Sequence, residues 1–288
     1  KTLPNPGGGG GGGRGGGSPQ AGGGWVDGGL PPARRAVELG MIDAVAYEDE
    51  GVGSGYGTLP AAARFAPSAR RSTEPKRVAL VSLEGIIVPG HSRKSPVPLP
   101  LFGEVTAGSE TVVRALRAAG RDKRTAAVVF HVDSGGGSAL ASDLIWREVK
   151  LLAERMPVVA VMGAVAGSGG YYVLTHATRV MAEATTLTGS IGVVMMKAVM
   201  QELYERQGIN VETIERGRFS PIMDSSRPFD DAERALMERQ MAEVYERFVA
   251  RVAEGRKLSP ERVNEIGRGR IWSGADALGI GLVDELGD

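Results

Sequence analysis

Residues 126–132 (AAVVFHV) and 157–162 (PVVAVM) form two apolar runs of strand length. A glycine-rich stretch follows each run, DSGGGS at residues 133–138 and AGSGGYY at residues 166–172. Strands that are apolar on both faces are typical of a parallel sheet covered by helices. Residues 140–155, between the two runs, have a helical pattern. This alternation predicts an α/β fold with a buried parallel sheet.

The same pattern continues on both sides of these strands. Residues 78–83 form a β-branched run, and residues 109–119 predict a helix with Ser109 as its N-cap. Residues 230–256 have the clearest helical pattern, with apolar side chains every three or four positions. Ser259 and the proline after it predict the start of another helix. Regular structure is therefore expected from residue 76 to the end of the chain.

The composition excludes several classes of protein. The 288 residues include 34 basic and 34 acidic side chains, a balance that argues against a nucleic-acid partner. No cysteine is present, which excludes disulfides, thiolate metal sites and a cysteine nucleophile. No apolar run reaches the roughly 18–20 residues that a spanning helix needs, so we expect this chain itself to be soluble. No phosphate-binding loop and no metal-spaced histidine pair occurs, so we expect no cofactor.

The chain divides into four predicted regions. Residues 1–24 are mostly glycine and are expected to be disordered, residues 25–50 contain a short apolar segment, and residues 51–75 are a linker. Residues 76–288 form the main domain.

The short apolar segment repeats a sequence near the end of the chain. Residues 36–43 read AVELGMID and residues 277–284 read ALGIGLVD. Both predict a helix end, a capping glycine and a short apolar strand closed by aspartate. We therefore interpret residues 25–50 as the tail of a preceding repeat of the same domain.

The two glycine-rich loops predict a catalytic site. Because both follow strands of a parallel sheet, they meet at its carboxyl edge. Ser168 lies between glycines at a strand-to-helix turn, which exposes its hydroxyl beside a helix N-terminus. The amides of Gly136 and Gly169 are predicted to form an oxyanion hole. Their small neighbours Gly137 and Gly170 are candidates for the substrate groove, since they let a substrate backbone approach.

No histidine is well placed to activate this serine. His176 lies eight residues beyond Ser168 on what is predicted to be one helix, about 12 Å away at about 1.5 Å per residue. His131 lies within a predicted strand, and His91 lies in a polar segment with no evident partner. A Ser–His–Asp triad is therefore not expected.

Five blocks of this sequence form a recognisable set: residues 133–138, 162–172 (MGAVAGSGGYY), 186–193 (TLTGSIGV), 269–274 (GRIWSG) and 281–287 (GLVDELG). In order and spacing they resemble the signal peptide peptidase A family of serine–lysine peptidases. The resemblance implies a Clp-protease/crotonase-like spiral of ββα units with a C-terminal helical region. It also implies Ser168 as nucleophile and Gly136 and Gly169 as oxyanion hole. Gly135 departs from the family's usual proline and Gly167 from its usual alanine.

The resemblance further implies a peptidase that degrades signal-peptide remnants or other short apolar peptides. Members of the family form ring- or bowl-like homo-oligomers, often associated with a membrane. Their base is a lysine, and the position that carries it in single-repeat members is Ser220 here. Lys197 follows a predicted strand over residues 188–193. It is the only other lysine near a site block, and we interpret it as a surface or packing residue. In tandem members the first repeat supplies the lysine, so we expect this chain alone to be weakly active or inactive.

Two other functions stay open at the level of sequence. A crotonase-like acyl-CoA enzyme would use the two amides to stabilise an enolate and would not need Ser168. A pseudo-peptidase or assembly subunit would bind peptides without cutting them.

Overall fold

The computed structural model describes residues 31–40, 42, 44, 45, 47, 75–99 and 103–287, without the side chains of 95–99, 103 and 104. The chain divides into two compact units, one of Arg70–Met195 with Met241–Asp288 and one of Lys1–Ala69 with Met196–Gln240. The predicted disordered segment, residues 1–24, lies outside the described residues, as does the predicted linker apart from residue 75. The four predicted regions therefore stay a prediction.

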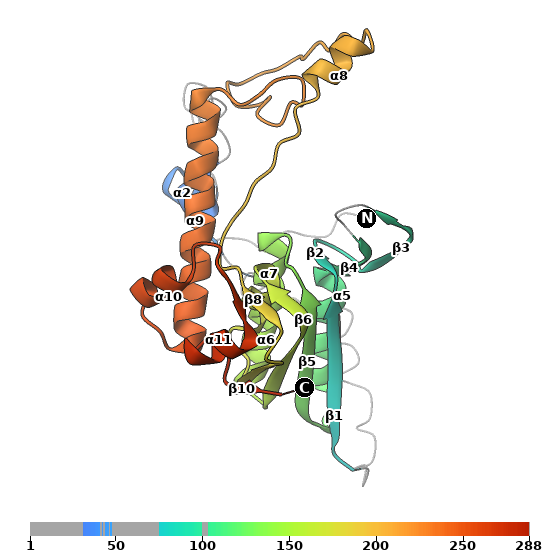
Figure 1. Ribbon diagram of the computed structural model, residues 1–288, viewed down its shortest axis with the longest axis vertical. Helices are drawn as coiled ribbons and strands as arrows, with labels where there is room; N and C mark the ends of the chain where they lie inside the picture. The colour runs from blue at the N-terminus through green and yellow to red at the C-terminus, as the bar shows by residue number, and fades with distance from the viewer. Residues whose placement is uncertain are drawn as a thin grey trace, which may run out of the picture. The chain divides into compact units, whose positions relative to one another are not determined.

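A parallel sheet forms the centre of the larger unit (Figure 1). Its strands have the order β1-β5-β6-β7-β10, and every neighbouring pair in that order is parallel. The predicted α/β class with a parallel sheet is therefore confirmed. The five strands are β1 (Arg77–Glu84), β5 (Thr125–Ser134), β6 (Val158–Gly167), β7 (Arg179–Ala182) and β10 (Glu285–Leu286).

Helices cover one face of this sheet. α5 (Ser109–Arg121), α6 (Ala139–Ala153) and α7 (Gly169–Leu174) contact β1, β5 and β6. The alternate β5 residues Val128, Phe130 and Val132 are fully buried on that face, at 0% exposure. This burial explains why the β5 sequence is so apolar, since each such side chain contributes about 1.5–3 kcal/mol to folding.

Shorter elements complete the larger unit. β8 (Leu187–Gly189) pairs with the end of β6 and, antiparallel, with β9 (Ile271–Ser273). A small second sheet contains β2 (Ile86–Val88), β4 (Gly103–Gly108) and β3 (Arg93–Leu99), in that order, which the sequence pattern did not predict. Helix α10 (Pro260–Ile266) begins as predicted, because the Ser259 side chain accepts a hydrogen bond from the Arg262 amide. Helix α11 (Gly274–Gly279) precedes β10.

Three local predictions were wrong. Ser109 is not an N-cap but the first residue of α5, because β4 runs directly into the helix and Gly108 takes the cap position. A predicted strand over residues 188–193 ends at Gly189, where the φ angles of Gly189 (78°) and Ser190 (48°) turn the chain away. The strand expected before Asp284 instead begins after it, as β10.

The smaller unit contains helix α2 (Ala33–Glu38), helix α8 (Gln201–Arg206) and the beginning of α9 (Asp231–Arg256). A reciprocal capping pair fixes the start of α9. The Asp230 carboxylate accepts from the Glu233 amide at 2.8 Å, and the Glu233 carboxylate accepts from the Asp230 amide at 3.0 Å. Arg227 binds both oxygens of Glu233, which lowers the pKa of this buried carboxyl to about 2.

The two segments that repeat in sequence have the same local backbone. In α2, the amides of Leu39 and Gly40 donate to the carbonyls of Arg35 and Val37, and the φ angle of Gly40 is 67°. The matching residues at the end of α11 make the same pair of hydrogen bonds around Gly281, whose φ is 84°. The predicted helix end and capping glycine are thus present in both segments. Met41 and Asp43 lie outside the described residues.

The two segments differ in how well their apolar residues are covered. Val283 follows the capping glycine by two residues and is 2% exposed in the larger unit. Ile42 holds the matching position after α2 and is 42% exposed. Among the described residues, the two segments therefore share a local backbone but differ in the exposure of the residue two positions after the capping glycine.

An ion pair connects the end of α9 to the chain segment before β10. Both outer nitrogens of the Arg256 guanidinium contact the Asp284 carboxylate, at 3.0 and 2.6 Å, and only 7% of the Arg256 side chain is exposed. Burial acts to raise the pKa of Asp284, but hydrogen bonds from Arg256 and from the Val180 amide outweigh it and hold the pKa below its usual value. The pair holds the C-terminal segment against β7.

Replacing Asp284 tests this connection. We expect Asp284→Ala to lower the free energy of unfolding by about 3–5 kcal/mol, because it leaves the buried Arg256 charge without its carboxylate. Chemical denaturation measures the loss. The matched control is Glu202→Ala, which removes an exposed pair with Arg206 and should change stability by less than about 1 kcal/mol. Equal effects of the two substitutions would contradict the structural role of the Arg256–Asp284 pair.

Candidate active site

Ser168 occupies a sharp turn between β6 and α7. Its φ and ψ angles are 50° and −121°, a conformation that non-glycine residues rarely adopt. Its own amide donates to the Gly189 carbonyl at 2.9 Å, and its carbonyl accepts from the Tyr172 amide. Ser168 itself stays partly exposed. Backbone strain of this kind, at a strand-to-helix turn, is typical of an activated serine.

The second glycine-rich loop lies directly against this turn. Ser134, at the end of β5, pairs in register with Ala166 of β6, so both loops leave the sheet at the same edge. A Cβ atom placed on Gly136 would lie 2.6 Å from the Gly169 nitrogen and 2.9 Å from the Ser168 Cβ. A Cβ on Gly169 would lie 3.3 Å from the Gly137 nitrogen. The structure thus brings Gly136, Gly137, Ser168 and Gly169 together.

The two amides predicted to form the oxyanion hole differ in their bonding. Gly169 is the first residue of α7, so its amide has no partner within that helix. The Gly136 amide donates to the Ser134 hydroxyl oxygen at 3.1 Å, within its own loop. Ser134 is 2% exposed and donates in turn to the Gly85 carbonyl at 2.6 Å. One predicted donor is therefore engaged by Ser134.

The two groove candidates lie in different surroundings. Gly137 is exposed and pairs with Ile87 of β2. Gly170 is buried, and a Cβ there would lie 2.3 Å from the Ser134 carbonyl oxygen. The position of Gly170 is thus one of close backbone packing, and its role in a groove stays a prediction.

Hydrogen bonds from side chains with no predicted role stabilise the two loops. The Asp133 carboxylate accepts from the Val165 amide at 3.1 Å and so connects the ends of β5 and β6. The Thr188 hydroxyl of β8 donates to the Ala166 carbonyl at 2.8 Å. Asp133, Ser134 and Thr188 all lie inside the sequence blocks that resemble the family, so their importance could have been suspected. The sequence does not show which of their side chains face the loops.

Alanine substitutions at two adjacent glycines test the close contact between the loops. We expect Gly136→Ala to lower the free energy of unfolding by about 1–3 kcal/mol, because φ at this position is 105° and the new methyl group collides with Ser168 and Gly169. Gly135→Ala is the matched control, since nothing lies within 4 Å of its Cβ position. It should change stability by less than about 1 kcal/mol. Thermal denaturation compares the two, and a Gly135→Ala loss as large as that of Gly136→Ala would contradict the contact.

Each histidine has a hydrogen-bond or ion-pair partner other than Ser168. His176 is not on the helix of Ser168, because α7 ends at Leu174. Its Nδ1 accepts from Trp146 Nε1 at 2.8 Å, and its Nε2 lies 3.5 Å from the Glu254 carboxylate. His131 Nδ1 lies 4.0 Å from a Glu84 oxygen. His91, for which no partner was predicted, lies 3.3 Å from the Glu110 carboxylate.

His176 belongs to a charged aromatic cluster between α6, α9 and the end of α7. Arg251 lies 3.8 Å and Lys150 lies 5.5 Å from the centre of the Trp146 ring, and Lys150 also binds Glu254 at 2.5 Å. Burial lowers the pKa of His176, and the Lys150 and Arg251 charges act in the same direction, against the opposite effect of Glu254. His176 is therefore neutral near pH 7, with Nδ1 as the acceptor for Trp146.

This lowered pKa makes the stability of the folded chain pH-dependent. Between its folded pKa and about pH 6.5, the usual value, His176 binds more protons in the unfolded chain than in the folded one. Stability should therefore fall as pH drops below about 6.5. Chemical denaturation from pH 7.5 to 5 measures it, and His176→Gln should flatten this part of the profile. His91→Gln, which removes an exposed imidazole, is the control, and an unchanged profile in His176→Gln would contradict the assignment.

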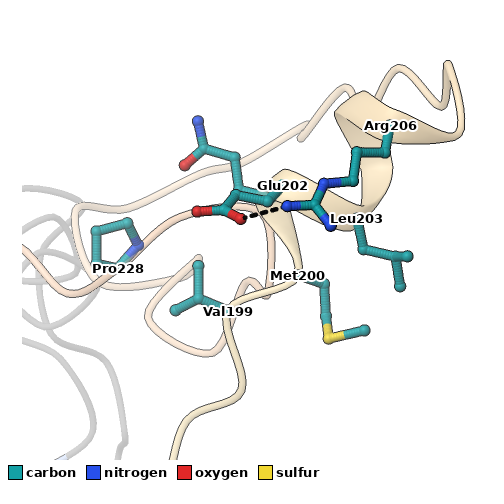
Figure 2. Close-up of a pocket in the computed structure, with 7 residues that line it drawn as sticks. Val199, Met200, Glu202, Leu203, Arg206 and Pro228 are labelled. Carbon is teal, nitrogen blue, oxygen red and sulfur yellow. Dashed lines mark hydrogen bonds and ion pairs between the residues drawn. The ribbon is translucent and has the colours of Figure 1, made fainter.

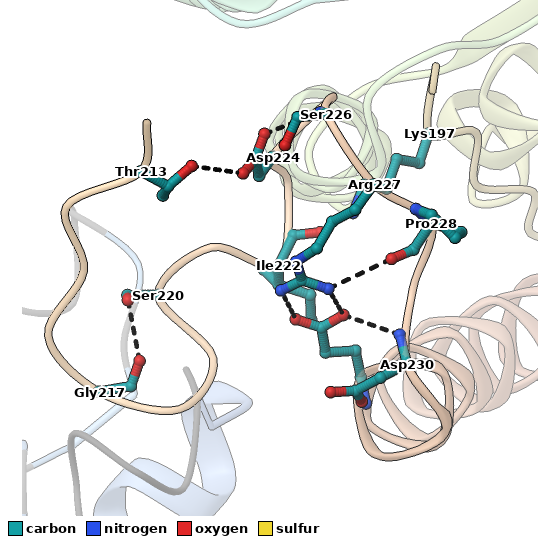
Figure 3. Close-up of polar contacts among 11 residues, drawn as sticks. Lys197, Thr213, Gly217, Ser220, Ile222, Asp224, Ser226, Arg227, Pro228 and Asp230 are labelled. Atoms are coloured by element: carbon teal, nitrogen blue, oxygen red, sulfur yellow. Dashed lines mark hydrogen bonds and ion pairs between the residues drawn. The ribbon is translucent and has the colours of Figure 1, made fainter. Parts of the chain in front are cut away.

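Lys197 and Ser220, the two positions considered for a catalytic lysine, lie in the smaller unit (Figure 3). Lys197 Nζ donates to the Ile222 carbonyl at 2.8 Å and lies 4.4 Å from the Phe229 ring, a packing environment within its own unit. Ser220, the predicted position of the family lysine, is exposed and donates to the Gly217 carbonyl at 2.8 Å. Neither residue makes a contact that suits a catalytic base.

A hollow of about 670 Å³ lies in the smaller unit (Figure 2). It contains an ion pair between Glu202 and Arg206 at 3.3 Å but no serine, histidine or lysine. The hollow therefore has no side chain that could act as a nucleophile or base of the predicted kind. None of its residues belongs to the two glycine-rich loops. The lining residues are Val199, Met200, Gln201, Glu202, Leu203, Arg206 and Pro228.

Known proteins are similar in sequence to the part of this chain that contains the Ser168 loop. The sequence profile of peptidase family S49 matches residues 150–288, which include Ser168. The protein slr0021 of Synechocystis sp., whose name describes it as a candidate protease, is 34% identical over 197 residues, 68% of this chain and 71% of that protein. The chain belongs to peptidase family S49. This assignment confirms the predicted resemblance to the signal peptide peptidase A family.

Other S49 relatives are longer. The chloroplastic serine protease SPPA of Arabidopsis thaliana is 42% identical over 180 residues, covering 62% of this chain and 27% of that protein. Protease 4 of Haemophilus influenzae is 35% identical over 217 residues, covering 74% of this chain and 33% of that protein. This S49 chain therefore spans about a quarter to a third of the length of these two relatives.

In this S49 chain, strands and helices alternate around a parallel sheet, which confirms the α/β part of the predicted fold. Among solved structures, the chain is similar to a single-substitution mutant of ClpP1 from Listeria monocytogenes, with a TM-score of 0.46 and 15% identity, covering 73% of this chain and 91% of that one. Among the residues that the structure describes, no helix has both the length and the apolar character to span a bilayer.

Proposed function

We propose that this chain carries the nucleophile of a serine–lysine dyad peptidase that degrades short apolar peptides such as signal-peptide remnants. The observation that carries the proposal is the strained turn that presents Ser168 against the Gly136 loop, in a chain of family S49. In this mechanism the Ser168 hydroxyl gives its proton to the lysine as its oxygen bonds to the peptide carbonyl carbon. The lysine then returns a proton to the amine that leaves when the C–N bond breaks. The Gly169 amide, and the Gly136 amide once released from Ser134, stabilise the oxyanion that forms.

A lysine from a preceding repeat of the same domain completes the proposed dyad. Two observations support this part of the proposal. Ser220, at the position that the resemblance assigns to the lysine of single-repeat members, has a side chain that donates to the Gly217 carbonyl, and Lys197 is bound to the Ile222 carbonyl. The α2 segment also repeats the backbone of the α11 segment, as the end of a preceding repeat would. Arginine cannot replace the lysine, because a guanidinium does not lose its proton in proteins.

Restoring the lysine within this chain tests the proposal. The purified chain should hydrolyse a fluorogenic apolar peptide weakly or not at all, and Ser220→Lys should raise the rate about 10²–10⁴-fold, the usual contribution of a general base. The increase should disappear in Ser220→Lys/Ser168→Ala. Ser220→Arg is the matched control, since it adds the same charge without a group that can act as a base.

Three other experimental outcomes would contradict this proposal. Robust hydrolysis by the unchanged chain that Ser168→Ala abolishes would refute the need for a second repeat. Acyl-CoA turnover that survives Ser168→Ala would favour the crotonase-like alternative. Failure of a fluorophosphonate to label Ser168, even in Ser220→Lys, would favour the pseudo-peptidase.

A further inference from the structure

Helix α7 directly follows Ser168 and is too short to hold its own orientation. It has six residues, fewer than two turns at about 3.6 residues per turn, whereas isolated helices need about 12–15 residues to be even marginally stable. All six residues are buried, so neighbouring elements hold the helix in place. Its first residue is Gly169, and the Tyr172 amide donates to the Ser168 carbonyl at 2.9 Å. Whatever fixes α7 therefore also fixes Ser168 and Gly169.

Tyr172 connects α7 to α6. Its hydroxyl donates to the Asp143 carboxylate at 2.6 Å, and only 5% of Tyr172 is exposed. A hydrogen bond to a charged carboxylate is about twice as strong as one between neutral groups. Burial and the Asp143 charge both raise the pKa of Tyr172, so the hydroxyl keeps its proton and remains a donor.

The neighbouring tyrosine makes a different connection. The Tyr171 hydroxyl donates to the Leu282 carbonyl at 2.8 Å, in the segment before β10. This acceptor is a neutral backbone group, so the bond is weaker than a bond to a carboxylate. Of these two connections, the one between Tyr172 and Asp143 therefore contributes more to the position of α7.

Packing from α6 and α9 fixes the Tyr172 ring itself. The Trp146 ring of α6 meets it edge-on, with ring centres 6.2 Å apart and planes at 80°. The centre of the Phe248 ring of α9 lies 4.9 Å from that of Tyr172. On the same helix, Arg251 Nε lies 3.7 Å from the Asp143 carboxylate. Both the donor and the acceptor of the hydrogen bond are therefore held in place by α9.

We propose that Tyr172 is a positioning residue, which through its hydrogen bond to Asp143 fixes the beginning of α7 and with it the Ser168 turn and the Gly169 amide. The φ angle of Ser168 is 50°, and a strained turn persists only where its surroundings hold it. Without the Tyr172 hydroxyl the short helix can shift, and a shift of about 1 Å at a reacting group can lower the rate about 10²-fold. The catalytic consequence rests on the proposed function, whereas the effect on the turn does not.

Hydrogen exchange measured by mass spectrometry tests the turn in the full chain without any need for activity. In Tyr172→Phe, the amides of residues 168–175 should exchange about tenfold faster, because local opening no longer breaks the bond to Asp143. Asp143→Ala should have the same effect. Asp143→Asn should have a smaller one, since asparagine keeps an oxygen acceptor for the Tyr172 hydroxyl. Tyr204→Phe is the matched control, because its hydroxyl contacts Ser225 in the smaller unit, and it should leave this segment unchanged.

Labelling by a fluorophosphonate tests the catalytic consequence in the Ser220→Lys chain. Adding Tyr172→Phe should lower the maximal labelling rate of Ser168 about tenfold and leave the half-saturating probe concentration within about twofold. A residue that only stabilised the fold would lower the fraction of folded protein, which circular dichroism measures, and not this rate. Absence of labelling in Ser220→Lys itself would count against the proposed function alone, and hydrogen exchange would still decide the role of Tyr172.

Three results would overturn the proposal. The first is unchanged exchange of residues 168–175 in Tyr172→Phe. The second is an equal increase in Tyr204→Phe. The third is an Asp143→Asn variant that exchanges as fast as Asp143→Ala.

Discussion

The contact between the backbones of Gly136 and Gly169 is the constraint on which the site depends. Any side chain at Gly136 would lie within 3 Å of the next loop, and one at Gly169 would lie 2.5 Å from the Ser142 hydroxyl. Two turns that end adjacent parallel strands can therefore lie in direct contact only where both lack a Cβ atom. The parallel register of β5 and β6 brings the turns to one edge, and Asp133 and Thr188 hold them there. The partly exposed position of Ser168 follows from this arrangement.

Much of this arrangement could be predicted from the sequence because its signals are strong and local. The apolar runs of β5 and β6, the helices after them and the serine between glycines each have a direct physical reading, and each element was found near its predicted place. The glycine after α2 and the glycine after α11 were also predicted correctly, since a helix end followed by a left-handed residue strongly favours glycine.

The parts that could not be predicted depend on tertiary contacts. β2, β3 and β4 are short and partly polar, and their pairing across the sequence leaves no periodic signal. The N-cap of α5 was misplaced because a strand runs directly into the helix, which no local pattern reveals. The environment of His176 depends on Trp146, Lys150, Arg251 and Glu254, which come from two helices far apart in the sequence.

The hydrogen bond between the Gly136 amide and Ser134 has a consequence for the ground state of the free chain. In the proposed oxyanion hole, the Gly136 amide is already satisfied within its loop, so of the two proposed donors only the Gly169 amide would be preorganised before a substrate arrives. Releasing Gly136 costs about 0.5–1.5 kcal/mol, the usual net value of one such bond. In the proposed mechanism this energy comes from substrate binding along the loop, so the second oxyanion donor becomes available only in the complex with a peptide.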